Sequence, residues 1–250
     1  MPIGPREREV VRRAAARMGL ETPLRVAWER LHSDVRRDRI DNEHLRLLLA
    51  FSLREDANCV DVGAHSGAIL REMVRIAPRG HHIAYEPLPE FAARLTAEFP
   101  SVDVRNAAVS NESGEATFFR MVAGEMQSGL KLRTGTPPEA AQSYAVRLDK
   151  LDDALPADYV PALIKIDVEG GERQVIEGAM ETLVRHAPVV VFEHGPGAEE
   201  EYQTTPEQVF DLLVADAGMR IFDIDGIGPY SRSQFVETYH LPIWNFVAHR

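Results

Sequence analysis

The sequence contains one cysteine, Cys59, and no long apolar run. A single cysteine cannot form an intramolecular disulfide, which favours a reducing compartment. The first twenty residues mix Glu7 and Glu9 among arginines without the apolar core of a signal peptide, and no later run approaches the ~20 apolar residues of a membrane span. We therefore expect a cytoplasmic protein with no membrane span.

Positive charge is also scarce, because the 250 residues carry a formal net charge of -11. Nucleic-acid binding depends on clustered Lys and Arg side chains that neutralise phosphates, so this balance argues against a nucleic-acid partner. A small neutral or cationic ligand fits better. With 44% hydrophobic residues, the chain is long enough for one large domain with a full core.

Apolar strand patterns alternate with amphipathic helical patterns along most of the chain. Strands are expected at 58–62, 81–86, 102–109, 162–168, 188–194, 219–225 and 244–250, and helices from near Ser66 and over 88–99, 171–186 and 205–218. Continuous apolar strands between such helices predict a mostly parallel sheet covered on both faces, which is a doubly wound α/β fold. The segment 226–243 shows no clear helix, so the last two strands are expected to pair antiparallel at one edge.

The N-terminal segment has a different character from the rest. Residues 5–18 and 24–37 have the spacing of Arg-rich amphipathic helices, and a third helix is expected to open at Asp41 as its N-cap. We expect residues 1–40 to form a helical extension or cap and residues 41–250 to form the main domain. The extension could cover the active site of its own chain or dock on a neighbouring chain, which leaves a homo-oligomer open.

The loop after the first strand carries a nucleotide-binding pattern. Asp61, Gly63 and Gly67 lie at the expected strand-to-helix turn, where glycines let the backbone approach a ligand and the helix presents free N–H groups. Glu86 ends the second strand, where an acid can accept hydrogen bonds from ribose hydroxyls. Asp61 occupies the place of the first glycine of the dinucleotide fingerprint, which disfavours pyrophosphate and suits an ammonium group. A ligand with a ribose, a cationic amino-acid portion and no phosphate is S-adenosylmethionine. His65 is expected near the tail of this cofactor.

Carboxylates gather where the strand at 162–168 ends. Ligands of doubly wound sheets bind outside the carboxyl ends of the strands, so this end should lie beside the cofactor's reactive group. Because strand side chains alternate, Lys165, Asp167 and, if the extension persists, Glu169 are expected on one face. A buried lysine is costly without a carboxylate partner, and Asp167 could be that partner. Glu172 is expected in the first turn of the next helix, where the helix dipole favours its charge.

Several motifs together resemble the FkbM-type S-adenosylmethionine-dependent methyltransferases. They are "VDVGAHSG", "AYEP", "NAAVSNESGEATFF", "VRLDKL", "IKIDVEGGERQVIEGA" and "VVFEH", and the resemblance covers about residues 41–250. It implies a Rossmann-like class I methyltransferase fold with seven strands in the order 3-2-1-4-5-7-6, and acceptor hydroxyls on sugars, glycolipids, polyketides or other secondary metabolites. It places Asp61, Gly63 and Gly67 in the cofactor loop, Glu86 at the ribose and Asn106 near the adenine.

An alcohol acceptor needs a general base, and four residues at adjacent strand ends are the candidates: Asp167, Glu169, Glu193 and His194. Our hypothesis is that Glu169 or His194 takes the proton while Asp167 orients the acceptor or the cofactor's amino group. The same four residues supply oxygen and nitrogen ligands, so Mg²⁺ or Mn²⁺ holding the acceptor is an alternative to a metal-free site.

Other functions stay open at this point. N-methylation of an amine would also suit an acidic rim, and a non-catalytic S-adenosylmethionine-binding protein would share the cofactor loop. An NAD-dependent oxidoreductase would share the fold and Glu86, but Asp61 and the missing glycine fingerprint disfavour it. The sequence therefore predicts methyl transfer to a small-molecule acceptor.

Overall fold

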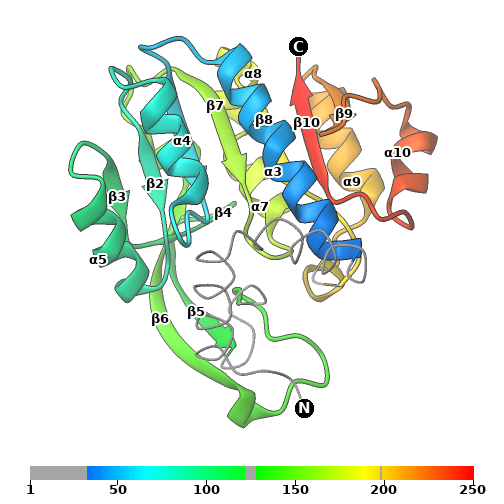
Figure 1. Cartoon of the computed structure of the whole chain (residues 1–250). Helices are drawn as coiled ribbons and strands as arrows, with labels where there is room; N and C mark the ends of the chain where they lie inside the picture. Colours follow the sequence, from blue (N-terminus) through cyan, green and yellow to red (C-terminus); the bar gives the residue numbers. More distant parts are fainter. Residues whose placement is uncertain (1–32, 122–127, 198) are drawn as a thin grey trace, which may run out of the picture. The chain divides into compact units, whose positions relative to one another are not determined.

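The computed structural model describes residues 33–121, 128–197 and 199–250 (Figure 1). The expected helix at 5–18 lies outside these residues, as does the helix at 24–37 except for its last five residues. Those five belong to α3 (Ser33–Ser52), which therefore begins before the predicted start at Asp41. Asp41 is not an N-cap: it lies inside the helix, where its carboxylate pairs with Arg37 Nε at 2.7 Å.

The chain divides into two compact units, 1–46 and 47–250, and the second holds all the strands of the described chain. The boundary expected after residue 40 stays a prediction. None of the described helices is long and apolar enough to span a bilayer.

The main sheet has seven strands in the order β3-β2-β1-β7-β8-β10-β9. These strands are β1 (Asn58–Val62), β2 (Ile83–Tyr85), β3 (Asp103–Arg105), β7 (Pro161–Ile166), β8 (Val189–Glu193), β9 (Arg220–Asp223) and β10 (Asn245–His249). Neighbouring strands in the series β3-β2-β1-β7-β8 are parallel, and β10 pairs antiparallel with both β8 and β9. The class I methyltransferase order and the antiparallel edge are both confirmed.

Helices cover both faces of this sheet. On one face, β1 and β7 present Val60, Val62, Ile164 and Ile166 to a core that includes residues of α7 (Glu172–Gly178), α8 (Met180–His186) and α9 (Pro206–Phe210). On the opposite face, α4 (Ala68–Ile76) lies over the sheet (Figure 1) and buries Leu70 and Met73. The carboxyl ends of the strands therefore open onto one edge between two helical layers, as a doubly wound sheet requires.

Three helical expectations need correction. The helix predicted over 171–186 is broken at Ala179 into α7 and α8, and the one over 205–218 continues from α9 as a π-helical turn, η4 (Asp211–Asp216). The segment 226–243, expected to lack a helix, contains α10 (Arg232–Thr238). Ser231 and Gln234 form a reciprocal capping box at its start, so the Ser-x-x-Gln spacing was the signal that we missed.

The strand predicted at 102–109 is two strands in two sheets. β3 ends at Arg105, while β4 (Ala108–Ser110) belongs to a second sheet with β6 (Ala141–Lys150) and β5 (Gly114–Met121), in the order β4-β6-β5. β6 includes Asp149, and the short helix α6 (Leu151–Ala154) follows it.

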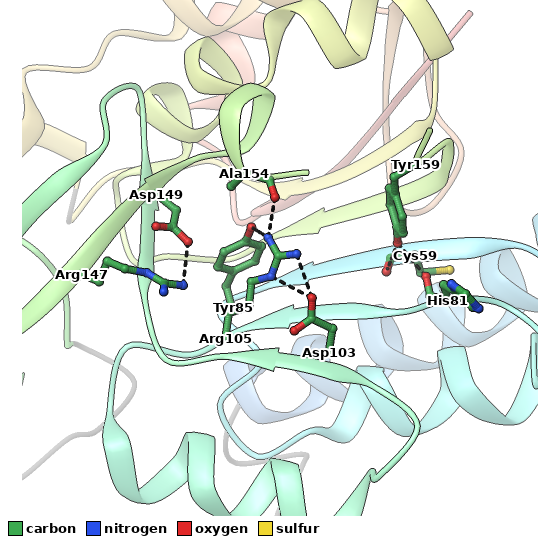
Figure 2. Close-up of polar contacts among 9 residues, drawn as sticks. All are labelled: Cys59, His81, Tyr85, Asp103, Arg105, Arg147, Asp149, Ala154 and Tyr159. Carbon is green, nitrogen blue, oxygen red and sulfur yellow. Dashed lines mark hydrogen bonds and ion pairs between the residues drawn. The ribbon is translucent and has the colours of Figure 1, made fainter. Parts of the chain in front are cut away.

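Two polar side chains tie the strands to the segment between β6 and β7 (Figure 2). The Arg105 guanidinium donates to the Tyr85 hydroxyl at 2.7 Å, to the carbonyl of Ala154 at 2.8 Å and to Asp103 at 2.8 Å. The Tyr159 hydroxyl lies 3.0 Å from the Cys59 carbonyl and 2.7 Å from the His81 carbonyl, so its single proton serves both. These contacts hold the ends of β1, β2 and β3 in register.

Candidate active site

The loop after β1 is shaped by two glycines with positive φ. A Cβ atom on Gly63 (φ +80°) would lie 1.9 Å from the carbonyl oxygen of Asp167, so only glycine lets the β1 and β7 loops approach this closely. A Cβ atom on Gly67 (φ +73°) would lie 2.6 Å from Leu95 in α5 (Pro89–Glu98). Both glycines predicted for the cofactor loop are therefore required by the fold around it.

Lys165 joins two acids at the centre of the sheet. It lies beside Asp61 in the register of β1 and β7, and its Nζ is 3.4 Å from Asp61 Oδ1 and 3.1 Å from Asp167 Oδ2. Nζ also donates to the carbonyl of Gly63 at 2.8 Å. Burial disfavours charge on Lys165, but Asp167 and Asp61 together raise its pKa above the ordinary value. The expected pairing of Lys165 with Asp167 is present, and Asp61 joins it.

Asp61 is the most buried acid of this group. It is 1% exposed, and neither carboxylate oxygen has a hydrogen-bond partner among the described residues. Burial raises its pKa, with Lys165 opposing the shift. A carboxylate oxygen that lacks a hydrogen-bond partner at the end of a strand can accept a hydrogen bond from a ligand.

Glu86 is held at the end of β2 by backbone donors. Its Oε2 accepts the N–H of His65 at 2.8 Å and its Oε1 accepts the N–H of Leu88 at 2.9 Å. Asn106 Nδ2 donates to the carbonyls of Glu86 and Pro87, both at 2.9 Å, and so fixes the same turn. The structure thus brings together Glu86, His65 and Asn106, three of the predicted cofactor residues.

The His65 side chain packs against α5. Its ring meets Phe91 edge-on at 4.8 Å between centroids, and its backbone has a φ of +44°. The backbone of His65 therefore supports Glu86, while a direct contact with the cofactor stays a prediction.

The turn after β7 breaks the alternation expected for Glu169. The strand ends at Ile166, and Glu169 has a left-handed backbone with a φ of +58°. Its Oε2 lies 3.2 Å from the Arg133 guanidinium. Glu172 is the first residue of α7, as expected, but it is also buried and accepts the Val168 N–H at 2.9 Å. Glu169 therefore does not continue the row of Lys165 and Asp167.

Beside this turn is a cavity of about 90 Å³ that we call the acidic pocket. It is lined by Arg133, Glu169, Gly170, Glu172, Glu193, His194, Gly195, Pro196, Glu199 and Trp244. Our sequence analysis anticipated Glu169, Glu193 and His194 at this rim. It missed Arg133, Glu199 and Trp244 because each comes from a segment without a recognisable motif, and only the fold brings them here.

The carboxyl groups of the acidic pocket hold their protons more tightly than usual. Burial raises the pKa of Glu169 and of Glu172 to about 8, and neighbouring carboxylates add to both shifts. For Glu193 the charge of Asp167 comes first and burial second, and the pKa lies well above its ordinary value. Strongly shifted acids in a cavity are a common property of functional sites.

His194 and Glu199 form a buried pair. The distance from His194 Nδ1 to Glu199 Oε1 is 2.6 Å, and the imidazole stacks on Phe235 at 4.9 Å between ring centroids. Burial lowers the pKa of His194 to about 4 and raises that of Glu199 to about 9. Both shifts favour the uncharged forms, in which the Glu199 acid donates to Nδ1 and Nε2 keeps its hydrogen.

The segment from Gly129 to Thr134 crosses from the second sheet to the acidic pocket. Gly129 pairs with Phe119 of β5 through backbone hydrogen bonds of 2.8 and 3.0 Å. Further along, the Lys131 N–H donates to the Tyr202 hydroxyl at 3.1 Å and the Thr134 N–H donates to Glu201 at 2.5 Å. These contacts position Arg133 against Glu169.

No group of three or more His, Cys, Asp or Glu side chains within the described ranges is arranged to hold a metal ion. Of the four alternative ligands, Asp167 pairs with Lys165, Glu169 pairs with Arg133, and His194 Nδ1 meets Glu199. The metal-free site stays a prediction, with a metal-dependent reaction as its alternative.

The strand order and the loops at its carboxyl edge define a class I S-adenosylmethionine-dependent methyltransferase fold. Residues 61–221 match the family described as "Methyltransferase FkbM domain". The match covers more than half of the chain, so the chain belongs to this family.

Among solved structures, the chain resembles the methyltransferase FkbM from Methylobacillus flagellatus KT at 14% identity, with a TM-score of 0.47. The likeness covers 79% of this chain and 45% of that one, so the chain spans less than half of that relative's length. It also resembles the plantazolicin methyltransferase BpumL in complex with SAH, at 10% identity and a TM-score of 0.48, over 92% of this chain and 90% of that chain. An O-methyltransferase from Bacillus cereus in complex with SAH is similar at 12% identity and a TM-score of 0.45, over 82% of this chain and 77% of that chain. The comparison with curated proteins finds no match.

Proposed function

We propose that the protein transfers a methyl group from S-adenosylmethionine to a hydroxyl of a small-molecule acceptor. The observation that carries this proposal is the placement of buried Asp61 one strand away from the backbone-anchored Glu86. Neither Asp61 oxygen has a hydrogen-bond partner among the described residues, although Oδ1 lies 3.4 Å from Lys165 Nζ. Family membership supports the same activity.

The residues at the carboxyl ends of β1 and β2 fit the cofactor. The Asp61 oxygens can receive the donors of an ammonium group, and the backbone at Gly63 leaves no side chain in the way. Glu86 accepts one backbone N–H at each oxygen, and each oxygen keeps a second lone pair for a ribose hydroxyl. Asn106 uses its amide hydrogens on backbone carbonyls, so its Oδ1 is left to accept from an adenine amino group.

The bound cofactor supplies an electrophilic methyl group on a sulfonium, and the protein must position the acceptor and accept its proton. The acceptor oxygen attacks the methyl carbon, the carbon–sulfur bond breaks with its electron pair going to sulfur, and the hydroxyl proton moves to a base. Such a base contributes typically 10²–10⁴-fold.

We assign the base to Glu193. Unlike Glu169, which pairs with Arg133, it has no ion pair among the described residues, and it ends β8 next to the end of β7. Its raised pKa makes its carboxylate a stronger base than an exposed glutamate. His194 is less suited because its Nδ1 faces the Glu199 acid and its Nε2 then holds a hydrogen. Asp167, paired with Lys165, is suited to orient the acceptor.

The test is transfer of labelled methyl from the cofactor to a fractionated metabolite pool, with mass spectrometry to locate the attachment atom. We expect a product that gains one methyl on oxygen, and Glu193→Gln should lose about 10²-fold or more in turnover with unchanged SAH affinity. Glu181→Gln, an exposed position on α8, is the matched control. Methylation on nitrogen, or full turnover by Glu193→Gln, would contradict the proposal.

A further inference from the structure

The acidic pocket contains more carboxyl groups than permanently cationic side chains. Four of its lining residues are glutamates, and the single basic residue among its described lining, Arg133, pairs with Glu169. Asp167 lies close enough to be the main cause of the shift at Glu193. Three glutamates thus face the same space with no cationic partner among the described residues.

Glu199 gives a second and independent indication of a ligand. It is 2% exposed and lines the acidic pocket, and its Oε2 has no hydrogen-bond partner among the described residues. Its other oxygen is engaged with His194 Nδ1. Buried acceptor atoms are normally satisfied, so an orphaned one beside a cavity calls for a donor from outside the protein.

Trp244 adds an aromatic wall to the same cavity. Its carbonyl accepts the His194 N–H at 2.8 Å, which fixes it beside the glutamates. Indole rings attract ammonium and guanidinium groups through their π-systems, and the attraction grows when water is excluded. Carboxylates together with an aromatic side chain form a site for a hydrogen-bonding cation.

From these contacts we infer that the acidic pocket binds a positively charged group of the acceptor, a protonated amine or a guanidinium, while a separate hydroxyl of the same molecule is methylated. The raised pKa values of Glu169 and Glu172 agree with this inference, because carboxyl groups that hold protons through burial and mutual repulsion would release them to solvent when a cation binds beside them. The inference rests on the proposed methyl transfer, because the cation is taken to be part of the acceptor. Binding of a cation to the acidic pocket can nevertheless be tested without that activity.

The first experiment measures binding of simple probes to the whole protein. Trp28→Phe leaves Trp244 as the single tryptophan of the chain, so its emission reports on the pocket. Butylammonium and butylguanidinium should change this emission saturably, and n-butanol should not. Glu172→Gln, which keeps the acceptor for the Val168 N–H, should weaken cation binding roughly tenfold, whereas Glu181→Gln should not. Equal effects of butanol and the cations, or unchanged binding in Glu172→Gln, would overturn the inference.

The second experiment uses the natural acceptor. The metabolite pool is split on a cation exchanger before incubation with labelled cofactor. Label should enter only the retained fraction, at an oxygen atom, and Glu172→Gln should raise KM for that fraction roughly 10- to 100-fold with unchanged SAH affinity. Label in the neutral flow-through, or methyl on the amine itself, would overturn the inference. Absence of label in every fraction would count against the proposed function, and the probe measurement would then decide on the cation site alone.

Discussion

Replacing Lys165 by methionine is the sharpest test of the charge arrangement at the sheet centre. The substitution keeps the apolar stem and removes the ammonium that lies 3.4 Å from Asp61 and 3.1 Å from Asp167. It also leaves the carbonyl of Gly63 without its donor. Removing one partner of a buried ion pair typically costs 3–5 kcal/mol, because the remaining charge stays buried without compensation. With Asp61 1% exposed, we expect Lys165→Met to lose about 3–5 kcal/mol of unfolding free energy at pH 7.5.

The assay is urea unfolding followed by circular dichroism, with Lys131→Met at an exposed position as the control. The loss should shrink as the pH falls, because Asp61, whose pKa burial already raises, then takes up a proton and no longer needs the cation. Adding Asp61→Asn to Lys165→Met should recover part of the loss, giving a coupling energy above about 1 kcal/mol. A loss below about 1 kcal/mol at pH 7.5, or one that does not change with pH, would refute this account of the site.

Three further predictions concern the cofactor loop, the base and the acidic pocket. Gly63→Ala places a methyl group 1.9 Å from the Asp167 carbonyl at a φ of +80°, so SAH binding measured by calorimetry should be lost, and an affinity within threefold of wild type would contradict this. Because the pKa of Glu193 is raised and its ionised form is the base, kcat/KM should fall as the pH drops through a value well above 4.5, and cofactor affinity measured in parallel is the control. Folded-state pKa values of about 8 for Glu169 and Glu172 mean that the native state binds extra protons between their ordinary pKa of 4.5 and about 8. The stability that this proton binding contributes to the ligand-free protein should be complete below pH 4.5 and should be lost as the pH rises to about 8, so a urea midpoint that rises over this range would contradict the shifts.

Most of the main sheet could be predicted from sequence because its strands are short apolar runs between amphipathic helices. The antiparallel pairing of β9 with β10 was also predicted, although its premise, the lack of a helix at 226–243, is wrong because α10 lies there. The resemblance supplied the strand order. The division of residues 102–109 into two strands could not be predicted, because apolar Ala107 and Ala108 continue the strand pattern. Only tertiary pairing assigns the two halves to different sheets. Local propensity does not encode which sheet a short strand joins.

The candidate site divides in the same way. Asp61, Gly63 and Glu86 could be found because turn geometry and strand ends constrain them locally. Glu199 could not, since it acts through a contact with His194 that depends on how the chain folds back after β8. Glu169 was misplaced because β7 ends at Ile166, two residues before the predicted end of the strand, and Glu169 itself has a left-handed backbone.

The crossing of Gly129–Thr134 from the second sheet to the acidic pocket brings a residue from outside the main sheet, Arg133, to the candidate site. The residues that we propose for cofactor binding lie on β1, β2 and their loops, whereas Arg133 comes from the connection between β5 and β6. The N–H groups of Lys131 and Thr134, on either side of Arg133, donate to Tyr202 and Glu201, and Arg133 itself pairs with Glu169. Insertions or substitutions in that connection can change what the pocket admits without disturbing Asp61 or Glu86. The proposed cofactor site and the acidic pocket are thus built from different parts of the chain, so substitutions in the connection can be used to change the pocket alone.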